Sequence, residues 1–521
     1  GTREVWVAGI MVALLVVFAI FYLERRPHKI DGANLQRIRV DVGASDVQLT
    51  EVAAKEVTDK PRNDKRRYQY MTLPNGLQVL SVQDAESLKT AFAMAVKAGS
   101  YDDPPDLPGL AHFCEHMLFL GTKKYPEPSG FDDFMSKSGG QDNAYTASEV
   151  TVYFGELAKA ASEEGLSRFA DFFHEPLFDT RYVKKEVHAI DSEHAKNVQS
   201  PGFRILQAFN SLSNPASPLG RFHTGNFDTL YSLPHKEGKD PVEALKVYFK
   251  DRYCPKQMHL VTFGAAPLSE QLQKAAKLFG PIPRGSAQCS KPRVGFASPP
   301  AWTPDRLGKF MVVEGSAPQP QLWAQFTLPD LKKEFKSQPL EYLDYVLGYQ
   351  GENSFSRVLQ DHLGLAAGTS AMFDQSSIGT SLFVTVTLTP LGRDHPEAVL
   401  DVLYAYISVL RSGGVDGALY NTIKDVMKLK WDWSEPDGPS STASDLAERL
   451  TRLPAESLLS GDTRIDQPNL RLVESLIGML TPANMNVAFV DPNVTRHPLS
   501  KAEIKTLPYY GLKYSVENLS T

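Results

Sequence analysis

The order of secondary-structure signals is repeated on the two sides of a segment rich in proline and glycine, residues 281–304. Residues 70–160 run from strand-like segments through two helical segments to strand-like segments again, and residues 309–390 repeat this order. A recurring unit of this kind predicts an internal duplication. We therefore expect an α+β fold with two homologous domains, at residues 68–280 and 305–521, each a mixed β-sheet covered by helices.

The composition is typical of a folded globular protein, with 42% apolar and 22% charged residues. The net charge of −6 leaves no basic excess, so we expect no nucleic-acid partner. Cys114, Cys254 and Cys289 are too few and too scattered for a disulfide framework, which is compatible with a reducing compartment.

The N-terminus contains an apolar run, residues 5–23, with no charged side chain. Its length is close to that needed to cross the roughly 30 Å hydrocarbon core of a bilayer, and Trp6 and Tyr22 lie near its ends. A cleaved signal peptide is the alternative, but no small-residue cleavage site follows the run. We expect a single-pass membrane anchor within residues 1–24, followed by a charged tether at residues 25–67.

Basic residues are more frequent after this run than before it. Arg25, Arg26 and Lys29 follow it, whereas Arg3 precedes it. This bias favours a location of the C-terminal bulk on the cytosolic or matrix side. The mitochondrial inner membrane, the endomembranes and the plasma membrane are all compatible with it.

The strongest chemical signal is HFCEH, an H-x-x-E-H motif that inverts the usual zinc-protease order. His112 and His116 are four residues apart and share one face of a helix, with Glu115 beside them. Two imidazoles and a third protein ligand can hold zinc, and a carboxylate can take a proton from the bound water. The alternative is a core helix with polar residues. Because unpaired buried polar groups are costly, the apolar neighbours favour the catalytic interpretation.

The motif requires a further carboxylate downstream, and KKEVHAIDSEHAKN offers two. Glu186 and Glu193 are seven residues apart, so they share a helix face, and either could be the ligand. His188 and His194 do not lie on that face. We interpret both histidines as surface or supporting residues.

Longer stretches carry a resemblance to a known family. HFCEHMLFLGTKKYP, GGQDNAYTASE, EPLFD, EVHAIDSEHAKN and FHTGNFDTL are similar to the insulysin branch of the inverzincin (M16) metallopeptidases, over about residues 68–521. The resemblance implies that Glu193, 77 residues after His116, is the third zinc ligand, and that Glu186 supports the site. It also implies that Glu115 deprotonates the zinc-bound water and returns the proton to the leaving amine.

The same resemblance implies substrate contacts in the first domain. NAYT is similar to the family's edge strand that pairs with an extended peptide, so Asn143, Ala144 and Tyr145 are the candidate residues. An ordinary strand is the alternative, because pairing through the backbone needs few special side chains.

The second domain contains a segment, GYQGENSFSRVLQDHLG, that resembles the contributor to the family's exosite for substrate N-termini. Gly348, Gly351 and Ser354 are the candidate residues. Where the family usually has G-P-G-S, this chain has G-E-N-S. At the place where the first domain has HFCEH, the second domain has no His–Glu cluster.

The length of the chain raises the question of a partner. Insulysins carry four homologous domains in two halves that enclose a peptide, and this chain ends near where a first half would end. The second half of the family supplies an arginine and a tyrosine that stabilise the tetrahedral intermediate, and we find no counterpart here. The chain is therefore expected to be part of a longer protein, one of two partner chains, or a structural subunit.

The sequence thus predicts a zinc metalloendopeptidase that cleaves short peptides in an enclosed chamber and needs a second M16 half or partner chain. The alternative is an M16-derived structural subunit of a membrane complex with little or no peptidase activity. The intact set of four metal-site residues favours the enzyme.

Overall fold

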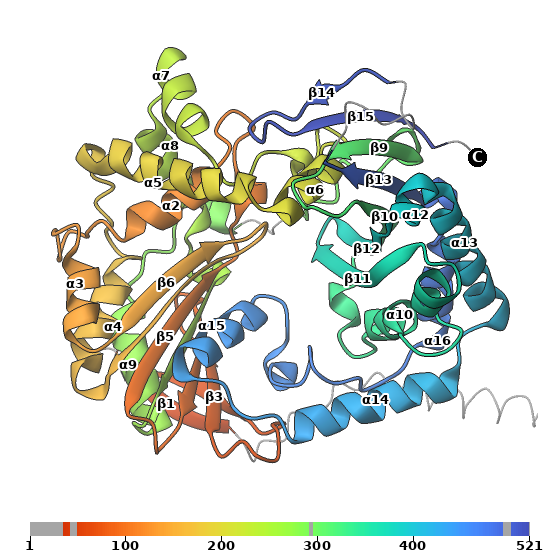
Figure 1. Ribbon diagram of the computed structural model, residues 1–521. Coiled ribbons are helices and arrows are strands. Elements are labelled where there is room, and N and C mark those ends of the chain that lie inside the picture. The colour runs from red at the N-terminus through yellow and green to blue at the C-terminus, as the bar shows by residue number, and fades with distance from the viewer. Residues whose placement is uncertain (1–34, 42–48, 291–294, 493–501, 520–521) are drawn as a thin grey trace, which may run out of the picture.

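The computed structural model describes residues 35–41, 49–290, 295–492 and 502–519. The predicted membrane anchor, residues 5–23, lies outside these ranges. Two β-sheets dominate the molecule and lie on opposite sides of it (Figure 1).

The first sheet has eight strands in the order β1-β2-β3-β4-β8-β5-β7-β6. Their bounds are β1 Leu35–Asp41, β2 Leu49–Val57, β3 Arg67–Thr72, β4 Gln78–Gln83, β5 Lys89–Val96, β6 Gln141–Thr146, β7 Thr151–Ala158 and β8 Met258–Gly264. The second sheet has seven strands in the order β11-β12-β10-β13-β9-β15-β14. Their bounds are β9 Lys309–Glu314, β10 Gln321–Leu328, β11 Ala366–Ser376, β12 Gly379–Leu388, β13 Met485–Asp491, β14 Lys505–Thr506 and β15 Lys513–Asn518.

The two sheets repeat one topology, which confirms the duplication and the α+β class. Strands β4 to β8 are arranged as β4-β8-β5-β7-β6, and strands β9 to β13 as β9-β13-β10-β12-β11. The equivalent pairs β4–β8 and β9–β13 are parallel, whereas the other pairs are antiparallel, so both sheets are mixed.

Apart from α9, which follows β8, the helices of the two halves lie between equivalent strands, namely between β5 and β6 or β7 and β8 in the first half, and between β10 and β11 or β12 and β13 in the second. Those of the first half are α2 Leu110–Leu118, α3 Gly130–Lys137, α4 Ser162–Asp171, α5 Thr180–Val198, α6 Pro201–Asn210, α7 Leu233–Lys236, α8 Pro241–Arg252 and α9 Leu268–Phe279. Those of the second half are α10 Pro339–Gly348, α11 Phe355–Arg357, α12 Pro390–Asp394, α13 Pro396–Gly413, α14 Gly417–Asp432, α15 Pro439–Leu450 and α16 Leu470–Met479.

The two faces of the first sheet carry side chains of different size. On β5, Phe92, Met94 and Val96 enter the large core beneath α2, α4 and α9, whereas the alanines at 91, 93 and 95 enter a smaller cluster on the opposite face. Successive residues of a strand point to opposite faces, so this alternation gives one bulky and one flat surface. The flat surface lets a helix approach closely.

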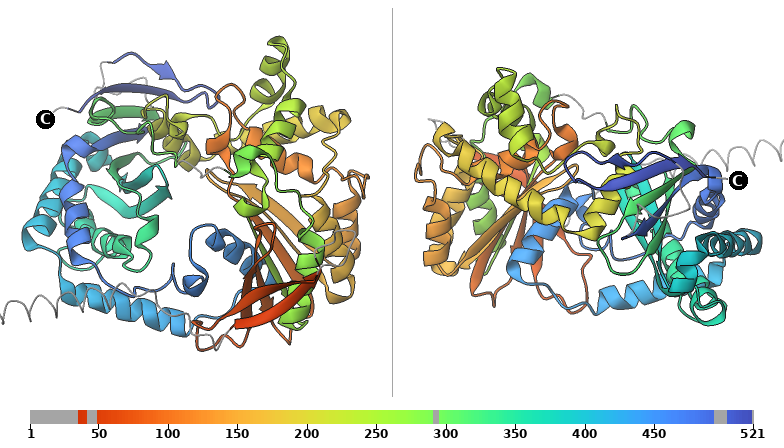
Figure 2. Two further views of the ribbon diagram at one scale, coloured as in Figure 1. Left: turned by 180° about the vertical axis from the view of Figure 1, so that it is seen from behind. Right: turned by 45° about the horizontal axis from the view of Figure 1, so that its top comes forward.

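The helix on that flat surface is α15, which comes from the second half of the chain. Ala443, Leu446, Ala447 and Leu450 pack on the face formed by β5, β7 and β8, and α15 is seen beside the inner side of the first sheet in both Figure 1 and Figure 2. The predicted domain at 305–521 therefore does not keep all its helices on its own sheet. The helical pattern of α15 shows that a face is apolar, but it does not specify which sheet that face meets.

The second sheet is covered in the reciprocal way. Ile205, Ala208 and Phe209 of α6, a helix of the first half, join a cluster with Trp323 and Phe383 of the second sheet. The opposite face of this sheet packs against α10, α13 and α16. Each sheet thus has one face covered by a helix from the other half of the chain.

Part of the predicted tether is instead sheet. Within residues 25–67 the chain forms β1 and β2, and β2 pairs with β3 through Ala54–Val57. Ala54 and Val57 are buried in the clusters on opposite faces of the sheet, and the charged Lys55 and Glu56 between them hid this strand in the sequence.

Cysteine pairing also differs from the sequence interpretation. Cys254 and Cys289 form a disulfide with a Cα–Cα distance of 5.9 Å, so the start of the segment between the sheets is linked to the first half. Cys114 is a buried free thiol.

Within the part of the chain that the structure describes, no single helix is sufficiently long and apolar to cross a bilayer. Taken together, α13 and α14 are long and apolar enough to span a bilayer by length and composition alone, but the pair is bent by 101°.

We predict that Leu446→Ala destabilises the protein by about 2–5 kcal/mol, because it opens a cavity between α15 and the first sheet. Leu446 is 4% exposed, whereas Leu429 on α14 is 60% exposed, so Leu429→Ala is the matched control and should change stability by less than about 0.5 kcal/mol. Urea denaturation followed by circular dichroism measures both. Equal midpoints for the two variants would contradict the packing role of α15.

Candidate active site

Helix α2 carries the motif, and a buried aspartate fixes where this helix begins. The Asp103 carboxylate accepts hydrogen bonds from the backbone N–H groups of Gly109 and Ala111, both at 2.7 Å. These are donors that a helix N-terminus leaves unsatisfied. Phe113 and Met117 point into the core, which leaves the His112 side of the helix facing the cleft.

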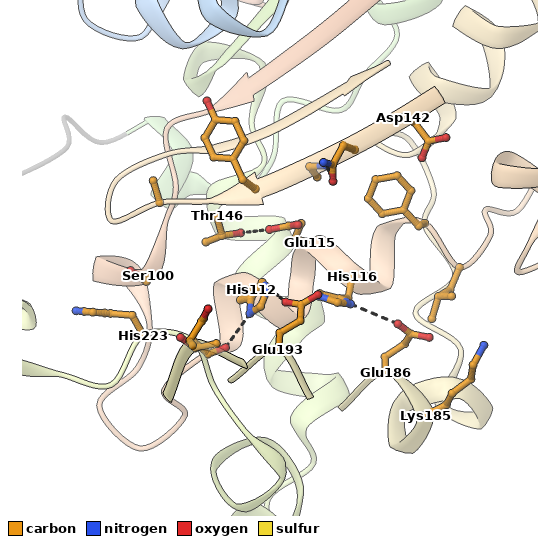
Figure 3. A pocket seen from close by; sticks show the side chains of 18 of the residues that line it. Ser100, His112, Glu115, His116, Asp142, Thr146, Lys185, Glu186, Glu193 and His223 are labelled. Atoms are coloured by element: carbon orange, nitrogen blue, oxygen red, sulfur yellow. Dashed lines mark hydrogen bonds and ion pairs between the residues drawn. The ribbon is translucent and has the colours of Figure 1, made fainter. Parts of the chain in front are cut away.

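Three side chains converge from two helices (Figure 3). Glu193 of α5 places one carboxylate oxygen 3.2 Å from His112 Nε2 and the other 3.7 Å from His116 Nε2. One ligand atom from each of the three residues lies within 4.8 Å of the others. Among the described residues these are the one group of three or more such side chains that could hold a metal ion.

These residues fit zinc in both chemistry and spacing. Zinc in catalytic sites takes imidazole nitrogen and carboxylate oxygen ligands in a tetrahedron, with bonds of about 2.0–2.2 Å and hence ligand-to-ligand distances of roughly 3.3–3.6 Å. The distances from Glu193 to the two imidazoles lie near this range. Three protein ligands also leave a fourth position for water.

The far side of each imidazole is held by a hydrogen bond. His116 Nδ1 lies 3.4 Å from a carboxylate oxygen of Glu186, and His112 Nδ1 lies 2.8 Å from the backbone oxygen of Thr224. Such bonds present Nε2 to the metal and fix the ring orientation. The structure therefore distinguishes the two glutamates that helical periodicity left equivalent. Glu193 faces the Nε2 atoms of both histidines, whereas Glu186 faces Nδ1 of His116.

The Thr224 carbonyl reaches His112 because two glycines meet. Gly109 and Gly225 both have positive φ, and a Cβ atom on Gly109 would lie 2.3 Å from the Gly225 Cα. No side chain fits at such a distance, so this approach requires glycine. The FHTGN motif therefore has a physical role that the sequence alone did not reveal.

Charge in the site favours a cation. Burial by itself would lower the pKa of His116, but its hydrogen bonds to Glu186 and Glu193 raise that pKa to about 9. Hydrogen bonds from His112 and His116 hold the pKa of Glu193 far below its usual range. Without metal the site therefore retains a proton at neutral pH, and zinc binding would release it.

Glu115 lies beside the three candidate ligands and is not a member of that group. Its carboxylate accepts a hydrogen bond of 2.5 Å from the Thr146 hydroxyl, and the side chain is buried. Burial raises the pKa of Glu115, whereas nearby His112 and the Thr146 hydroxyl act to lower it. A carboxylate with a raised pKa next to a metal-ligand group suits general base and acid chemistry. Thr146 is the last residue of the NAYT strand β6, and the sequence did not indicate its contact with Glu115.

A cleft of about 1110 Å³ joins these groups to strand β6. It is lined by the three candidate ligands, Glu115 and the predicted substrate residues Asn143, Ala144 and Tyr145. β6 is the last strand of its sheet, so its outer edge pairs with no other strand of the described residues. The Tyr145 hydroxyl donates a hydrogen bond to Glu448 of α15, which links the strand to the helix from the second half. The substrate-binding role of these residues remains a prediction.

The predicted exosite residues lie away from this cleft, in the connection between α10 and α11. Gly348 ends α10, and the hydroxyl of Ser354 accepts a hydrogen bond from the backbone N–H of Arg357. Neither these residues nor Gly351 belong to the cleft lining. Their proposed role in binding substrate N-termini is untested.

His194 supports the site in a way the sequence did not specify. It follows Glu193 directly and is buried, and its Nε2 atom donates a hydrogen bond of 2.9 Å to the backbone oxygen of Tyr509. The C-terminal segment is thereby attached to α5. His188 instead stacks on Phe227, with ring centroids 4.6 Å apart.

Family models match most of the chain. Residues 78–216 match "Insulinase (Peptidase family M16)", residues 241–427 match "Peptidase M16 inactive domain", and residues 431–521 match "Middle or third domain of peptidase_M16".

Curated relatives are similar over most of this chain. "Insulin-degrading enzyme-like 1, peroxisomal" of Arabidopsis thaliana is 32% identical, with 89% of this chain and 47% of that protein covered. "Insulin-degrading enzyme" of Homo sapiens is 31% identical, with 88% of this chain and 44% of that protein covered. The chain thus spans about half the length of the curated relatives it matches.

Two solved structures share the architecture. The crystal structure of pitrilysin has a TM-score of 0.81 and 27% identity, and the match covers 94% of this chain and 49% of that one. A protease from Helicobacter pylori has a TM-score of 0.65 and 20% identity, and the match covers 82% of this chain and 99% of that one. At this level of identity the match shows only that the two proteins share a fold.

The duplicated mixed sheets and the H-x-x-E-H helix, completed by a glutamate from a second helix, define a metallopeptidase class with the inverted zinc motif. The three family models and the relatives agree with that class. The chain belongs to the M16 insulinase family of peptidases and corresponds to the N-terminal half of its insulin-degrading-enzyme-like relatives.

We predict that Glu186→Ala weakens zinc binding by about 10–100-fold, because the hydrogen-bond partner of His116 Nδ1 is lost. Competition with a chromogenic chelator at pH 7 measures the affinity. Glu175→Ala is the control, since Glu175 is exposed and pairs with Lys123 away from the cleft. An affinity equal to that of the unmodified chain would exclude the supporting role of Glu186.

Proposed function

We propose that this chain carries the catalytic site of a zinc metalloendopeptidase that acts on short peptides together with a second half or partner chain. The observation that supports the proposal most directly is the convergence of His112, His116 and Glu193 beside Glu115, in one cleft bordered by an edge strand. His112, His116 and Glu193 would hold the zinc ion.

Zinc bound there would polarise the peptide carbonyl and lower the pKa of a bound water toward 7. Glu115 accepts the proton of the attacking water and later donates it to the departing amine. Thr146 orients the Glu115 carboxylate through its hydroxyl. Thr224 and Glu186 hold the two imidazoles in the orientation that the ligand set needs.

Strand β6 would bind the peptide as an added strand. Asn143, Ala144 and Tyr145 line the cleft beside Glu115, and backbone pairing with an added strand is largely independent of substrate sequence. Affinity would come from main-chain hydrogen bonds, and preference would come from the side chains along the cleft.

A second half is part of the proposal because the chain spans about half of its relatives. The resemblance to insulysins implies that the other half contributes an arginine and a tyrosine at the reaction centre. Electrostatic stabilisation of a developing oxyanion is often a large contribution to the rate, so the assembled protein is expected to be the active form.

We also propose that residues 5–23 anchor the protein as a single-pass segment in a cellular membrane. The apolar run ends at residue 23 and β1 begins at Leu35, so an extended connection between them is at most roughly 40 Å long. The folded part would therefore work close to the bilayer. The organelle is open among the mitochondrial inner membrane, the endomembranes and the plasma membrane.

We predict that Glu115→Gln lowers peptide hydrolysis by about 10²–10⁴-fold while zinc content stays at one ion per chain, because the proton acceptor alone is lost. Hydrolysis of a quenched fluorescent peptide by the assembled protein and metal analysis measure the two effects. Unchanged hydrolysis would contradict the role of Glu115. An unmodified assembly that binds zinc and cleaves no peptide would instead favour the structural-subunit alternative.

We predict that Thr146→Val moves the acidic limb of the pH profile of kcat/KM to higher pH by about one unit. The reason is that the Thr146 hydroxyl stabilises the ionised form of Glu115, so its removal raises a pKa that burial already raises. A base works only when ionised, so activity at low pH falls. Thr146→Ser retains the hydroxyl and should retain the profile, and identical profiles for all three proteins would contradict this coupling.

A further inference from the structure

The loop that holds His112 is itself attached to helix α5. Thr224, whose backbone oxygen lies 2.8 Å from His112 Nδ1, comes three residues before Phe227. The backbone N–H of Phe227 donates a hydrogen bond of 3.1 Å to a carboxylate oxygen of Asp191 on α5. Asp191 is not one of the three candidate ligands, yet it ties their helix to the loop that orients His112.

A second contact fixes the side chain of the same loop residue. The His188 ring of α5 stacks on the Phe227 ring, with centroids 4.6 Å apart and planes 16° from parallel. His188 and Asp191 are three residues apart, so they lie on one side of the helix. Phe227 also packs against the large core of the first half. Both its backbone and its ring are therefore held.

The chain between Thr224 and Phe227 has little freedom. Gly225 is in contact with Gly109 of the α2 N-terminus. Asn226 donates its backbone N–H to the Thr229 hydroxyl at 3.1 Å, and its side-chain oxygen accepts the Thr229 N–H at 2.9 Å. Because these contacts restrict the intervening torsions, a shift of Phe227 would move the Thr224 carbonyl as well.

Helix α5 thus supports both imidazoles of the candidate zinc site. Glu186 contacts His116 directly. Asp191 reaches His112 through the loop. Glu193, the candidate ligand that faces both rings, lies on the same helix. One helix would therefore supply a ligand and fix the orientation of the other two, and such outer contacts tune metal affinity.

On the basis of the proposed zinc site, we propose that Asp191 is a positioning residue that holds His112 in the orientation that binds the metal. Its hydrogen bond carries the effect, since the carboxylate accepts from a backbone N–H group that fixes the loop. Loss of this bond releases Phe227, and the Thr224 carbonyl then holds the His112 Nδ1 proton less firmly. Zinc affinity falls as a result, although all three ligands are still present.

Zinc affinity of the full chain, measured by competition with a chromogenic chelator at pH 7, tests this role. Asp191→Ala should weaken binding by about tenfold, the lower end of the range for groups that orient a ligand. Asp191→Asn keeps a side-chain oxygen for the Phe227 N–H and should bind within about twofold of the unmodified chain.

Asp228→Ala is the matched control, because Asp228 is the exposed acid that follows Phe227 and its removal deletes the same charge. It should also bind within about twofold of the unmodified chain. Equal affinities for Asp191→Ala and Asp228→Ala would overturn the inference. A loss in Asp191→Asn as large as that in Asp191→Ala would overturn it too, since charge would then be responsible.

NMR of the zinc-loaded chain with ¹⁵N-labelled histidine shows whether the effect reaches His112. Glu186→Ala removes the partner of the His116 Nδ1 proton, so it identifies that signal and leaves the His112 signal in place. In Asp191→Ala the His112 Nδ1 proton should exchange faster with water, and the His116 proton should not. Weaker zinc binding with an unchanged His112 proton would place the effect elsewhere and overturn the inference.

A second variant keeps the test decisive if Asp191→Ala does not fold. His188→Ala removes the other contact of α5 with Phe227, and it alters an exposed side chain. It should speed exchange of the same His112 proton. An unchanged exchange rate in this variant would contradict the route through Phe227.

Zinc affinity and peptide cleavage are separate measurements, which distinguishes failure of this inference from failure of the proposed function. The expected affinities in an assembly that cleaves no peptide would sustain the role of Asp191 and overturn the peptidase. Cleavage together with an affinity that is indifferent to Asp191→Ala would overturn the role of Asp191 alone. An unmodified chain that binds no zinc would overturn both.

Discussion

Each β-sheet of this protein depends on a helix from the other half of the chain. The flat face of the first sheet is covered by α15, and a face of the second sheet is covered by α6. An apolar sheet face left in water would be unfavourable, so neither half can bury its core fully without the other. This reciprocal packing also fixes α5, because α6 follows it within three residues of chain.

The metal site is a consequence of that arrangement. Glu193 and Glu186 lie on α5, whereas the histidines lie on α2, and the ligand distances of 3.2 and 3.7 Å exist only while the two helices keep their relative position. The hydrogen bond from His194 to Tyr509 ties the end of α5 to the C-terminal segment. Elements remote from the candidate site thus hold Glu193 in place, as a zinc site with three protein ligands and one open position would require.

Much of the site could be predicted because it is encoded locally. The spacing of His112 and His116 follows from the helical repeat, and the carboxylate was expected from the chemistry of zinc. The choice between Glu186 and Glu193 came from resemblance, since two residues seven apart share a face. Thr224 was missed because it acts through its backbone oxygen, which carries no side-chain signal. The contact of Thr146 with Glu115 was missed because a threonine in a strand is ordinary until its partner is known.

The repeated order of strands and helices, the apolar character of residues 5–23 and the ligand types of the candidate metal site follow from periodicity or from neighbouring side chains, and all three can be read from the sequence. The packing of α15 on the first sheet, the extension of that sheet by β1 and β2 and the pairing of Cys254 with Cys289 arise from the folded arrangement. The physical reason is the same in each case. An amphipathic pattern states that a face must be buried, and the identity of the covering surface depends on contacts between residues far apart in the chain.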